Sequence, residues 1–360
     1  MPCWSEVERG VFAETKINRL LRNENIVPTV FLLLAFIAWQ FSGFTGTFLF
    51  NQVLTRFIRD GVLVLALIIP VVAGMGLNFA ITVGAMAVQT ALLLVINFQV
   101  EGIKGILLVI AIGVLLSVIL GYIIGRILNR VKGKEMITTI IIGFLFNSIY
   151  QLIFLVGFGT FIPVINKEII LTKGIGVRNT VDLSIYRNTI DKLWMIKIGG
   201  LEIPLFMILV VLLFAGIIYY ILHTRFGQEI KAVGLDSERS ELAGINVNTV
   251  RIKVMILSTV LAAFGQLIYL QNVGMFDVYT AHMNADIISC AALLAGGASI
   301  KNAKIRQAII GIFLFHTLFI VSPQAGQNLF NNAALGEYFR SFVAYGTIAF
   351  ALIINIKNEK

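Results

Sequence analysis

The residues that could carry chemistry in this sequence are few and mostly uncharged. Three histidines, His223, His282 and His316, are scattered and show neither metal-ligand spacing nor the spacing of a hydrolase motif. The run Lys132-Gly133-Lys134-Glu135 does not match the nucleotide-binding loop, in which Gly-Lys is followed by Ser or Thr. The sequence therefore predicts no catalytic residue, no metal and no cofactor on this chain.

Acidic side chains within hydrophobic segments would indicate a carrier driven by protons or sodium ions, because such charges couple ion movement to solute movement. The sequence offers only Asp286 and Glu337, each near the outer end of its segment, where a helix N-terminus favours an acid anyway. For His316 a packing role is favoured over a proton relay. An ion-coupled secondary carrier or channel that acts without an ATPase remains the alternative function, and a membrane enzyme or scaffold using His316 or Asp286 is a further one.

Uncharged polar side chains recur at helical spacing within apolar segments. Asn78, Thr82 and Gln89 fall at i, i+4 and i+11, directly after two glycines, and Asn147 and Gln151 repeat the i, i+4 spacing. Such amides would suit a pathway for a neutral, hydroxyl-bearing solute, although interhelical hydrogen bonds explain the same pattern and stay open as an alternative. The candidate pathway residues are Gly74, Gly76, Asn78, Thr82, Gln89, Asn147, Gln151 and Gln266, the last sharing a helix face with Ser258.

The stretch 224–251 reads as two short helices with stop signals. Gly234 is predicted to end the first helix and Asp236 to cap the N-terminus of the second. Glu238 lies in the first turn of the second helix, and Gly244 supplies its left-handed C-terminal cap. A rigid, capped amphipathic helix of this kind is suited to pushing against a partner protein.

The elements that position these residues must be membrane helices. Of 360 residues, 58% are hydrophobic and 13% are charged, and the mean hydropathy is +0.91, which excludes a soluble cytosolic enzyme. We predict an all-α polytopic membrane protein of about ten transmembrane helices. The ten hydrophobic segments are 28–50, 61–76, 78–97, 105–126, 136–161, 204–223, 252–272, 285–299, 306–322 and 338–356.

Two segments differ from plain lipid-facing helices. Pro70, Gly74 and Gly76 predict a broken helix pair inside the bundle, beside a cavity, because freed backbone groups find no partners in lipid. The short segment 285–299 predicts a tilted or partly re-entrant helix. Close packing through small residues is the alternative for both.

The distribution of positive charge predicts the orientation. One set of loops carries 18 of the 28 Lys and Arg residues, and this side is expected to be cytoplasmic and to hold both termini. The net charge of +9 is assigned to this excess and not to nucleic-acid binding. The expected organisation is a cytoplasmic segment 1–27, a single transmembrane domain 28–356 and a cytoplasmic tail 357–360. Within the domain, 162–203 is an outer loop that we interpret as a small lid or docking surface, with a passive linker as the alternative.

The runs Thr224-Arg225-Phe226-Gly227, Lys231-Ala232-Val233-Gly234 and Ala243-Gly244-Ile245-Asn246-Val247 resemble the coupling loop of ABC importer permeases. The most similar group serves ribose-type sugars, nucleosides and branched-chain amino acids. Ala291 to Gly297, followed by a basic turn and Gly311, resembles the next block of that group. The likeness is strong over about 220–315 and weak over 1–60 and 162–203.

The resemblance implies a permease subunit of a bacterial or archaeal plasma membrane that works by alternating access. It implies two ABC ATPase subunits that bind ATP and Mg, a second permease subunit of the same or a different chain, and an extracytoplasmic solute-binding protein. A sugar or nucleoside is favoured over a branched-chain amino acid. By position, the residues that would enter the ATPase groove are Asp236, Ser237, Glu238, Arg239, Glu241, Ala243, Gly244, Ile245 and Asn246.

The sequence departs from the group's pattern at two places. After Gly296-Gly297 the run 298–306 is poor in glycine, and the outer loop 162–203 is longer than in the sugar-type pattern. The first departure favours an unequal, heterodimeric partner, and both leave the solute open.

Overall fold

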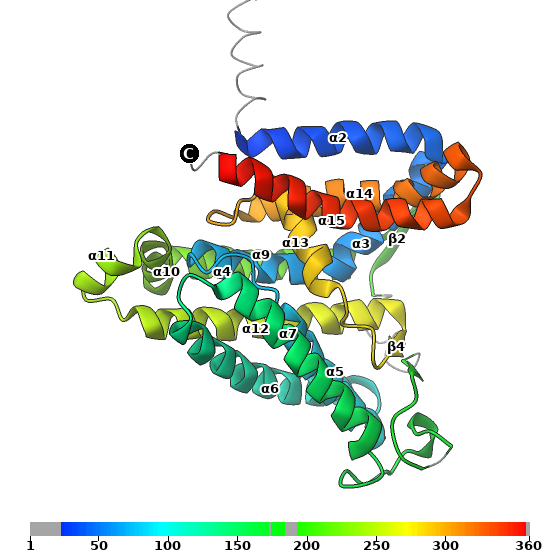
Figure 1. The fold of residues 1–360 in the computed structure, drawn as a ribbon. Helices are drawn as coiled ribbons and strands as arrows, with labels where there is room; N and C mark the ends of the chain where they lie inside the picture. The colour runs from blue at the N-terminus through cyan, green and yellow to red at the C-terminus, as the bar shows by residue number, and fades with distance from the viewer. Residues whose placement is uncertain (1–22, 173, 184–192, 358–360) are drawn as a thin grey trace, which may run out of the picture.

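The computed structural model describes residues 23–172, 174–183 and 193–357, and within these ranges most residues are helical (Figure 1). The predicted segments 1–27 and 357–360 therefore lie largely outside the described residues. The helices are α2 (Asn23–Ser42), α3 (Gly46–Ala66), α4 (Ile68–Val72), α5 (Ile81–Asn97), α6 (Gly102–Arg130), α7 (Glu135–Leu152), α9 (Leu205–His223), α10 (Arg225–Leu235), α11 (Ser237–Leu242), α12 (Val247–Val273), α13 (Ala285–Ala295), α14 (Ile305–Phe330) and α15 (Ala333–Lys357).

Six stretches of the described chain are long and apolar enough to cross a bilayer by length and composition, and the protein is an all-α polytopic membrane protein. They correspond to α2, α6, α7 with the π-helical turn η1 (Ile153–Gly157), α9, α12 and α14. Each of the ten predicted segments coincides wholly or partly with a helix. In Figure 1, α2 begins and α15 ends at the same end of the bundle as α10 and α11.

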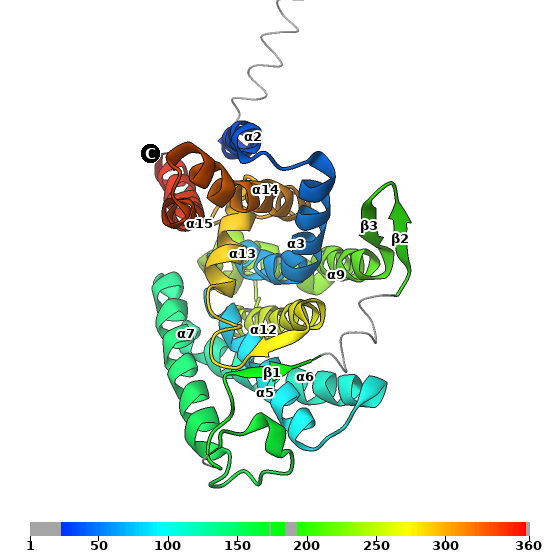
Figure 2. The same cartoon turned by 90° about the vertical axis from the view of Figure 1, so that its right-hand side faces the viewer.

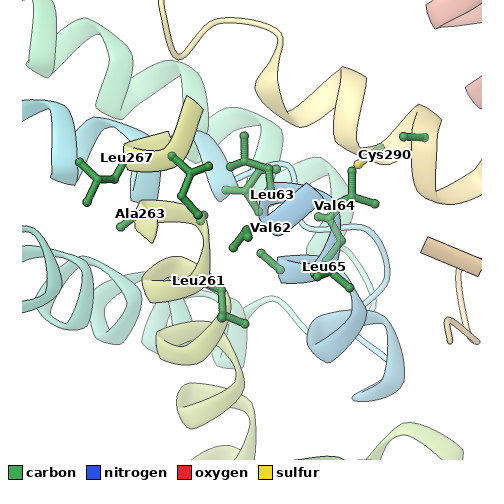
Figure 3. Close-up of a cluster of buried hydrophobic side chains, with 14 of the residues drawn as sticks. Val62, Leu63, Val64, Leu65, Leu261, Ala263, Leu267 and Cys290 are labelled. Atoms are coloured by element: carbon green, nitrogen blue, oxygen red, sulfur yellow. The ribbon is translucent and has the colours of Figure 1, made fainter. Parts of the chain in front are cut away.

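The centre of the bundle is α12, which packs against α3, α5 and α6 (Figure 2). Glycines let the backbones approach: a Cβ at Gly121 or Gly125 of α6 would lie 2.8 Å from the Cα of Ile256 or Ile252 on α12. Figure 3 shows a cluster of buried hydrophobic side chains from α3 and α12, in which Leu63 packs against Gly265 of α12. This close approach through small residues is how membrane helices associate.

The prediction of one span over 28–50 was wrong. A turn at 43–45 ends α2 at Ser42 and lets α3 begin at Gly46. Trp39 Nε1 donates a hydrogen bond to the Phe44 carbonyl oxygen, Gly43 adopts φ +71°, and Thr45 caps α3. Because α3 starts this early, residues 51–60, which lie between the first two predicted segments, are helical.

The predicted helix break is present. Pro70 lies within α4, which ends at Val72, and the chain then runs without helix to Ile81, with Gly74 and Gly76 both at positive φ. The segment 285–299 contains α13, whose 11 residues span about 16 Å, roughly half of a hydrocarbon core. It ends at Gly296, and Gly297 follows at φ +85°.

The described parts of the outer loop fold against the bundle. Strand β1 (Thr180–Asp182) pairs antiparallel with β4 (Met275–Asp277), which directly follows α12. Strands β2 (Met195–Ile198) and β3 (Leu201–Pro204) form a hairpin before α9, and η2 (Lys167–Ile169) is one 3₁₀ turn. Asn97 at the end of α5 bonds the backbone at Pro163 and Ile165. These contacts argue against a passive linker, although residues 173 and 184–192 lie outside the described part.

Two buried acids that the sequence analysis did not consider are paired with residues of other helices. Asp60 on α3 is buried, and its Oδ2 lies 3.1 Å from Nε2 of His316 on α14. Glu135 at the start of α7 is buried against Arg251 of α12, 2.5 Å between Oε1 and Nη2. A hydropathy profile cannot detect these two pairs, because the partners in each pair are far apart in the sequence.

Candidate functional site: the coupling segment and the polar pathway

The segment 224–246 folds as its capping signals predicted. Asp236 Oδ1 accepts a hydrogen bond from Arg239 N at 3.0 Å and so caps α11. At the other end Gly244 adopts φ +86°, and the amides of Gly244 and Ile245 donate to the carbonyl oxygens of Glu241 and Ser240, both at 3.0 Å. This is a Schellman cap. The prediction for the first helix was off by one residue, because α10 continues to Leu235.

The candidate coupling residues form a projecting surface at one end of the bundle (Figure 1). Glu238, Arg239 and Glu241 are exposed, and Ser240 between them is buried. Leu235 and Leu242, which the sequence analysis did not single out, are 89% and 88% exposed. Of the remaining candidates, Ala243, Gly244 and Asn246 are exposed, while Asp236, Ser237 and Ile245 are half-buried.

The coupling segment contacts the helix break directly. Gly234 of α10 lies against Val72 and Gly74, so a Cβ at Gly234 would clash with the Val72 carbonyl oxygen. A Cβ at Gly74 would in turn lie 3.0 Å from the Cα of Gly234. Gly76 lies against Met136 at the start of α7. The break predicted from Pro70 and the two glycines is thus packed against α10 and α7.

Three predicted pathway residues meet at a histidine that the sequence analysis set aside. His282 lies in the turn before α13; its Nδ1 is 3.0 Å from Gln89 Oε1 of α5, and its Nε2 is 2.8 Å from Asn147 Oδ1 of α7. Gln151 Nε2 donates to the same Asn147 oxygen at 3.3 Å. We call Gln89, Asn147, Gln151, Tyr150 and His282 the polar cluster.

The polar cluster carries unsatisfied groups in a buried place. Gln89 is fully buried and its Nε2 has no hydrogen-bond partner within the described chain; the same is true of the hydroxyl of Tyr150, which is 4% exposed. The Tyr150 ring contacts the imidazole edge-on, with centroids 5.1 Å apart. Asn147 and Gln151 are half-buried, so the cluster leads from a partly open face of α7 into the bundle.

The hydrogen-bonding capacity of the imidazole limits how His282 can bond to Gln89 and Asn147. A neutral imidazole has one N–H, so it cannot donate to both amide oxygens. Asn147 Oδ1 already accepts from Gln151, which leaves His282 Nε2 as the donor to Asn147 and Nδ1 as an acceptor. With Nδ1 as an acceptor, its 3.0 Å contact with Gln89 is a hydrogen bond when the Gln89 amide is turned so that NH₂ faces the ring, and in either orientation one polar atom of this buried amide has no partner within the described chain.

The other polar candidates for the pathway lie elsewhere in the bundle and form hydrogen bonds with other groups of the protein. The spacing predicted that Asn78 shares a helix face with Thr82 and Gln89. Asn78 instead precedes α5, and its Oδ1 accepts a hydrogen bond from Ala80 N. Its Nδ2 donates to Ser258 at 3.0 Å. Thr82 contacts the Phe79 carbonyl oxygen, and Gln266 donates to that of Ala281. For these residues the interhelical explanation holds at least in part.

Two further observations concern metal binding and a large pocket. No group of three His, Cys, Asp or Glu side chains within the described ranges is arranged to hold a metal ion. A pocket of about 1020 Å³ opens between the end of α5 and residues 165–182. Its lining carries both signs of charge, with Glu101, Lys167, Glu168, Arg178 and Asp182 among the residues.

The fold and the site thus define a polytopic membrane protein with a capped projecting helix pair joined to a broken membrane helix. Residues 49–352 match the family model described as branched-chain amino acid transport system / permease component. Because this match covers most of the chain, the chain belongs to that family.

Individual relatives are similar over a shorter stretch. The ribose import permease protein RbsC of Escherichia coli (strain K12) is 29% identical over 160 residues, 44% of this chain and 47% of the relative. The probable ABC transporter permease protein YphD of the same organism is 29% identical over 162 residues, 44% and 46%. The nucleoside ABC transporter permease protein NupC of Lactococcus lactis subsp. cremoris is 30% identical over 154 residues, 42% and 45%. The chain thus spans about half the length of these relatives, and no solved structure matches it.

Proposed function

We propose that the chain is the membrane-spanning permease subunit of an ATP-driven ABC importer that moves a small polar solute. The family description and the names of the relatives, which include ribose and nucleoside permeases, support this function. A sugar or nucleoside is favoured over a branched-chain amino acid, because the polar cluster contains amides, a phenol and an imidazole but no charged side chain to pair with a zwitterion.

The observation that carries the proposal is the contact of α10 with the helix break. Two partner ATPase subunits, which would bind ATP and Mg, would grip the projecting surface of α11. Closing of the ATPase dimer would move α10 and α11, and the packing of Gly234 on Val72 and Gly74 would pass that movement to the broken helix. The bundle would then rock between inward- and outward-facing states, as other proteins switch between two packed arrangements.

The pathway would run past the polar cluster. In the structure His282 joins α5 and α7 through Gln89 and Asn147. Opening would separate these groups, and hydroxyl groups of the passing solute would replace the lost hydrogen bonds. A weak site of this kind suits a system in which an extracytoplasmic binding protein supplies the affinity.

The remaining partners and the orientation follow from the same proposal. A second permease subunit would complete the pathway, and the binding protein would dock on the outer loop beside the pocket at Arg178 and Asp182. The end of the bundle that carries α10 and α11 would face the cytoplasm of a bacterial or archaeal cell, with both termini on that side.

The experiment is uptake by cells that produce the chain together with its partner subunits. Deletion of residues 236–244, or Gly244→Trp, should abolish ATP-driven uptake while the chain still inserts in the membrane. Gly133→Trp, between α6 and α7, is the matched control, since Gly133 and Gly244 both adopt positive φ and a Cβ at either meets nothing within 4 Å. Normal ATP-driven uptake by the deletion variant would refute the coupling role.

The buried contact between Asp60 and His316 favours the alternative, an ion-coupled carrier. The two functions differ in their energy source. Uptake that persists when ATP is depleted and stops when the proton or sodium gradient is collapsed would support the carrier and contradict the importer.

A further inference from the structure

A second pocket lies where two membrane helices end. It has a volume of about 470 Å³ and is bounded by the last turn of α9, by α10, by the end of α4 and by the connection from 302 to the start of α14. Because α9 ends at His223 and α14 begins at Ile305, and both are candidate membrane spans, the pocket lies at the level of the lipid headgroups.

The pocket is cationic at its rim. Lys231, Lys304, Arg306 and His223 line it, and no acidic side chain of the described chain is among its lining residues. The acids nearby on the coupling segment pair elsewhere, Glu229 with Arg225 and Asp236 with Arg239. Lys231 and Arg306 therefore offer two positive charges to an anion, and no carboxylate of the described residues lines the pocket beside them.

The walls of the pocket are apolar and continue onto an exposed apolar surface. Val72, Leu222, Ala303 and Ile305 form the walls. From Tyr219, which also lines the pocket, the exposed face of α9 continues through Leu212 and Leu209 at helical spacing. A cationic rim above an apolar track fits an amphiphile, whereas a free phosphate would use only the rim.

We infer that this pocket binds the phosphate of an anionic phospholipid, whose acyl chain lies along α9. Clusters of Lys and Arg beside membrane helices attract anionic lipids, and each cation strengthens binding about fivefold. Lys231 lies one turn before Gly234, so a bound headgroup ties α10 to the ends of α9 and α14 and steadies the contact of α10 with the helix break.

Binding can be tested on the purified full chain in detergent, without any transport assay. Phosphatidylglycerol should raise the melting temperature, because a ligand that binds only the folded state stabilises it. Phosphatidylcholine and inorganic phosphate should not. An equal shift with inorganic phosphate would show a site for free phosphate and overturn the assignment to a lipid.

The variant Lys231→Gln/Arg306→Gln should lose the phosphatidylglycerol shift. Its matched control, Lys132→Gln/Lys134→Gln, removes two exposed charges from the connection between α6 and α7 and should keep the shift. Equal shifts in the two variants would mean general attraction to a basic surface and would overturn the site.

Native mass spectrometry gives a second readout that does not depend on melting. With phosphatidylglycerol present, the unaltered chain and the control should retain one more tightly held lipid than the pocket variant. Equal lipid counts in all three proteins would overturn the inference, and this outcome is independent of whether the chain belongs to an importer.

Discussion

Gly234 of α10 and Gly74 beyond the end of α4 bring their backbones into contact, although 160 residues separate them in the sequence. A Cβ at Gly74 would lie 3.0 Å from the Gly234 Cα, and a Cβ at Gly234 would meet the Val72 carbonyl oxygen. A side chain at either position would push the two segments apart. A movement of the coupling segment therefore either carries the break in the membrane helix with it or separates the two segments at this contact.

The variant Gly234→Ala should reduce uptake by about tenfold or more, equivalent to roughly 1.4 kcal/mol in the coupled step. The added methyl group forces α10 away from Val72 while leaving the exposed surface of α11 intact. Gly216→Ala is the control, because its Cβ meets nothing within 4 Å. Uptake is measured with the partner subunits present, and the ATPase should still co-purify with both variants. Unchanged uptake in Gly234→Ala would contradict the coupling path.

The caps of α11 can be tested on the chain alone. Asp236→Ala removes the side chain that accepts from Arg239 N and should weaken the helix by about 1 kcal/mol, whereas Asp236→Asn should retain the cap. Hydrogen exchange at the amides of 240–243 should accelerate about fivefold in Asp236→Ala. If Asp236→Asn exchanged as fast as Asp236→Ala, the capping bond would not be what holds the helix.

His282→Ala and Gln89→Ala should each lower uptake about tenfold, the change expected when a buried polar group loses its partner. Gln271→Ala is the matched control: Gln271 is also a buried amide with one atom lacking a hydrogen-bond partner in the described chain, but it does not contact His282. Equal uptake in Gln89→Ala and Gln271→Ala would remove the polar cluster from the pathway.

Arg251→Met should destabilise the protein by about 3–5 kcal/mol, because it leaves Glu135 buried and unpaired. The double variant Arg251→Met/Glu135→Leu should recover much of the loss. Lys197→Ala breaks an exposed pair with Glu202 and should cost at most about 1 kcal/mol. Denaturant unfolding in detergent measures all three, and similar losses at Arg251 and Lys197 would contradict the buried ion pair.

Local signals explain why the coupling segment could be predicted from the sequence. The N-cap at Asp236 and the C-cap at Gly244 act within a few residues, so their residue types determine the geometry. The helix break after Pro70 is local in the same sense. Long apolar runs likewise predicted the membrane helices, since hydropathy reports burial in lipid directly.

The polar cluster could not be predicted because its contacts are long-range. His282 meets Gln89 and Asn147 across 193 and 135 residues, and no spacing in the sequence signals either contact. Asp60 was missed for a related reason. Its polar neighbourhood resembles a loop, and only its packing against His316 of α14 explains its place within a helix.

The most direct test of the proposed function is purification of the tagged chain from its native membrane in mild detergent, with every co-purifying chain identified by mass spectrometry. The account predicts an ATPase that carries a nucleotide-binding loop, and its release when residues 236–244 are deleted. A well-folded chain that purifies without any ATPase would contradict the account.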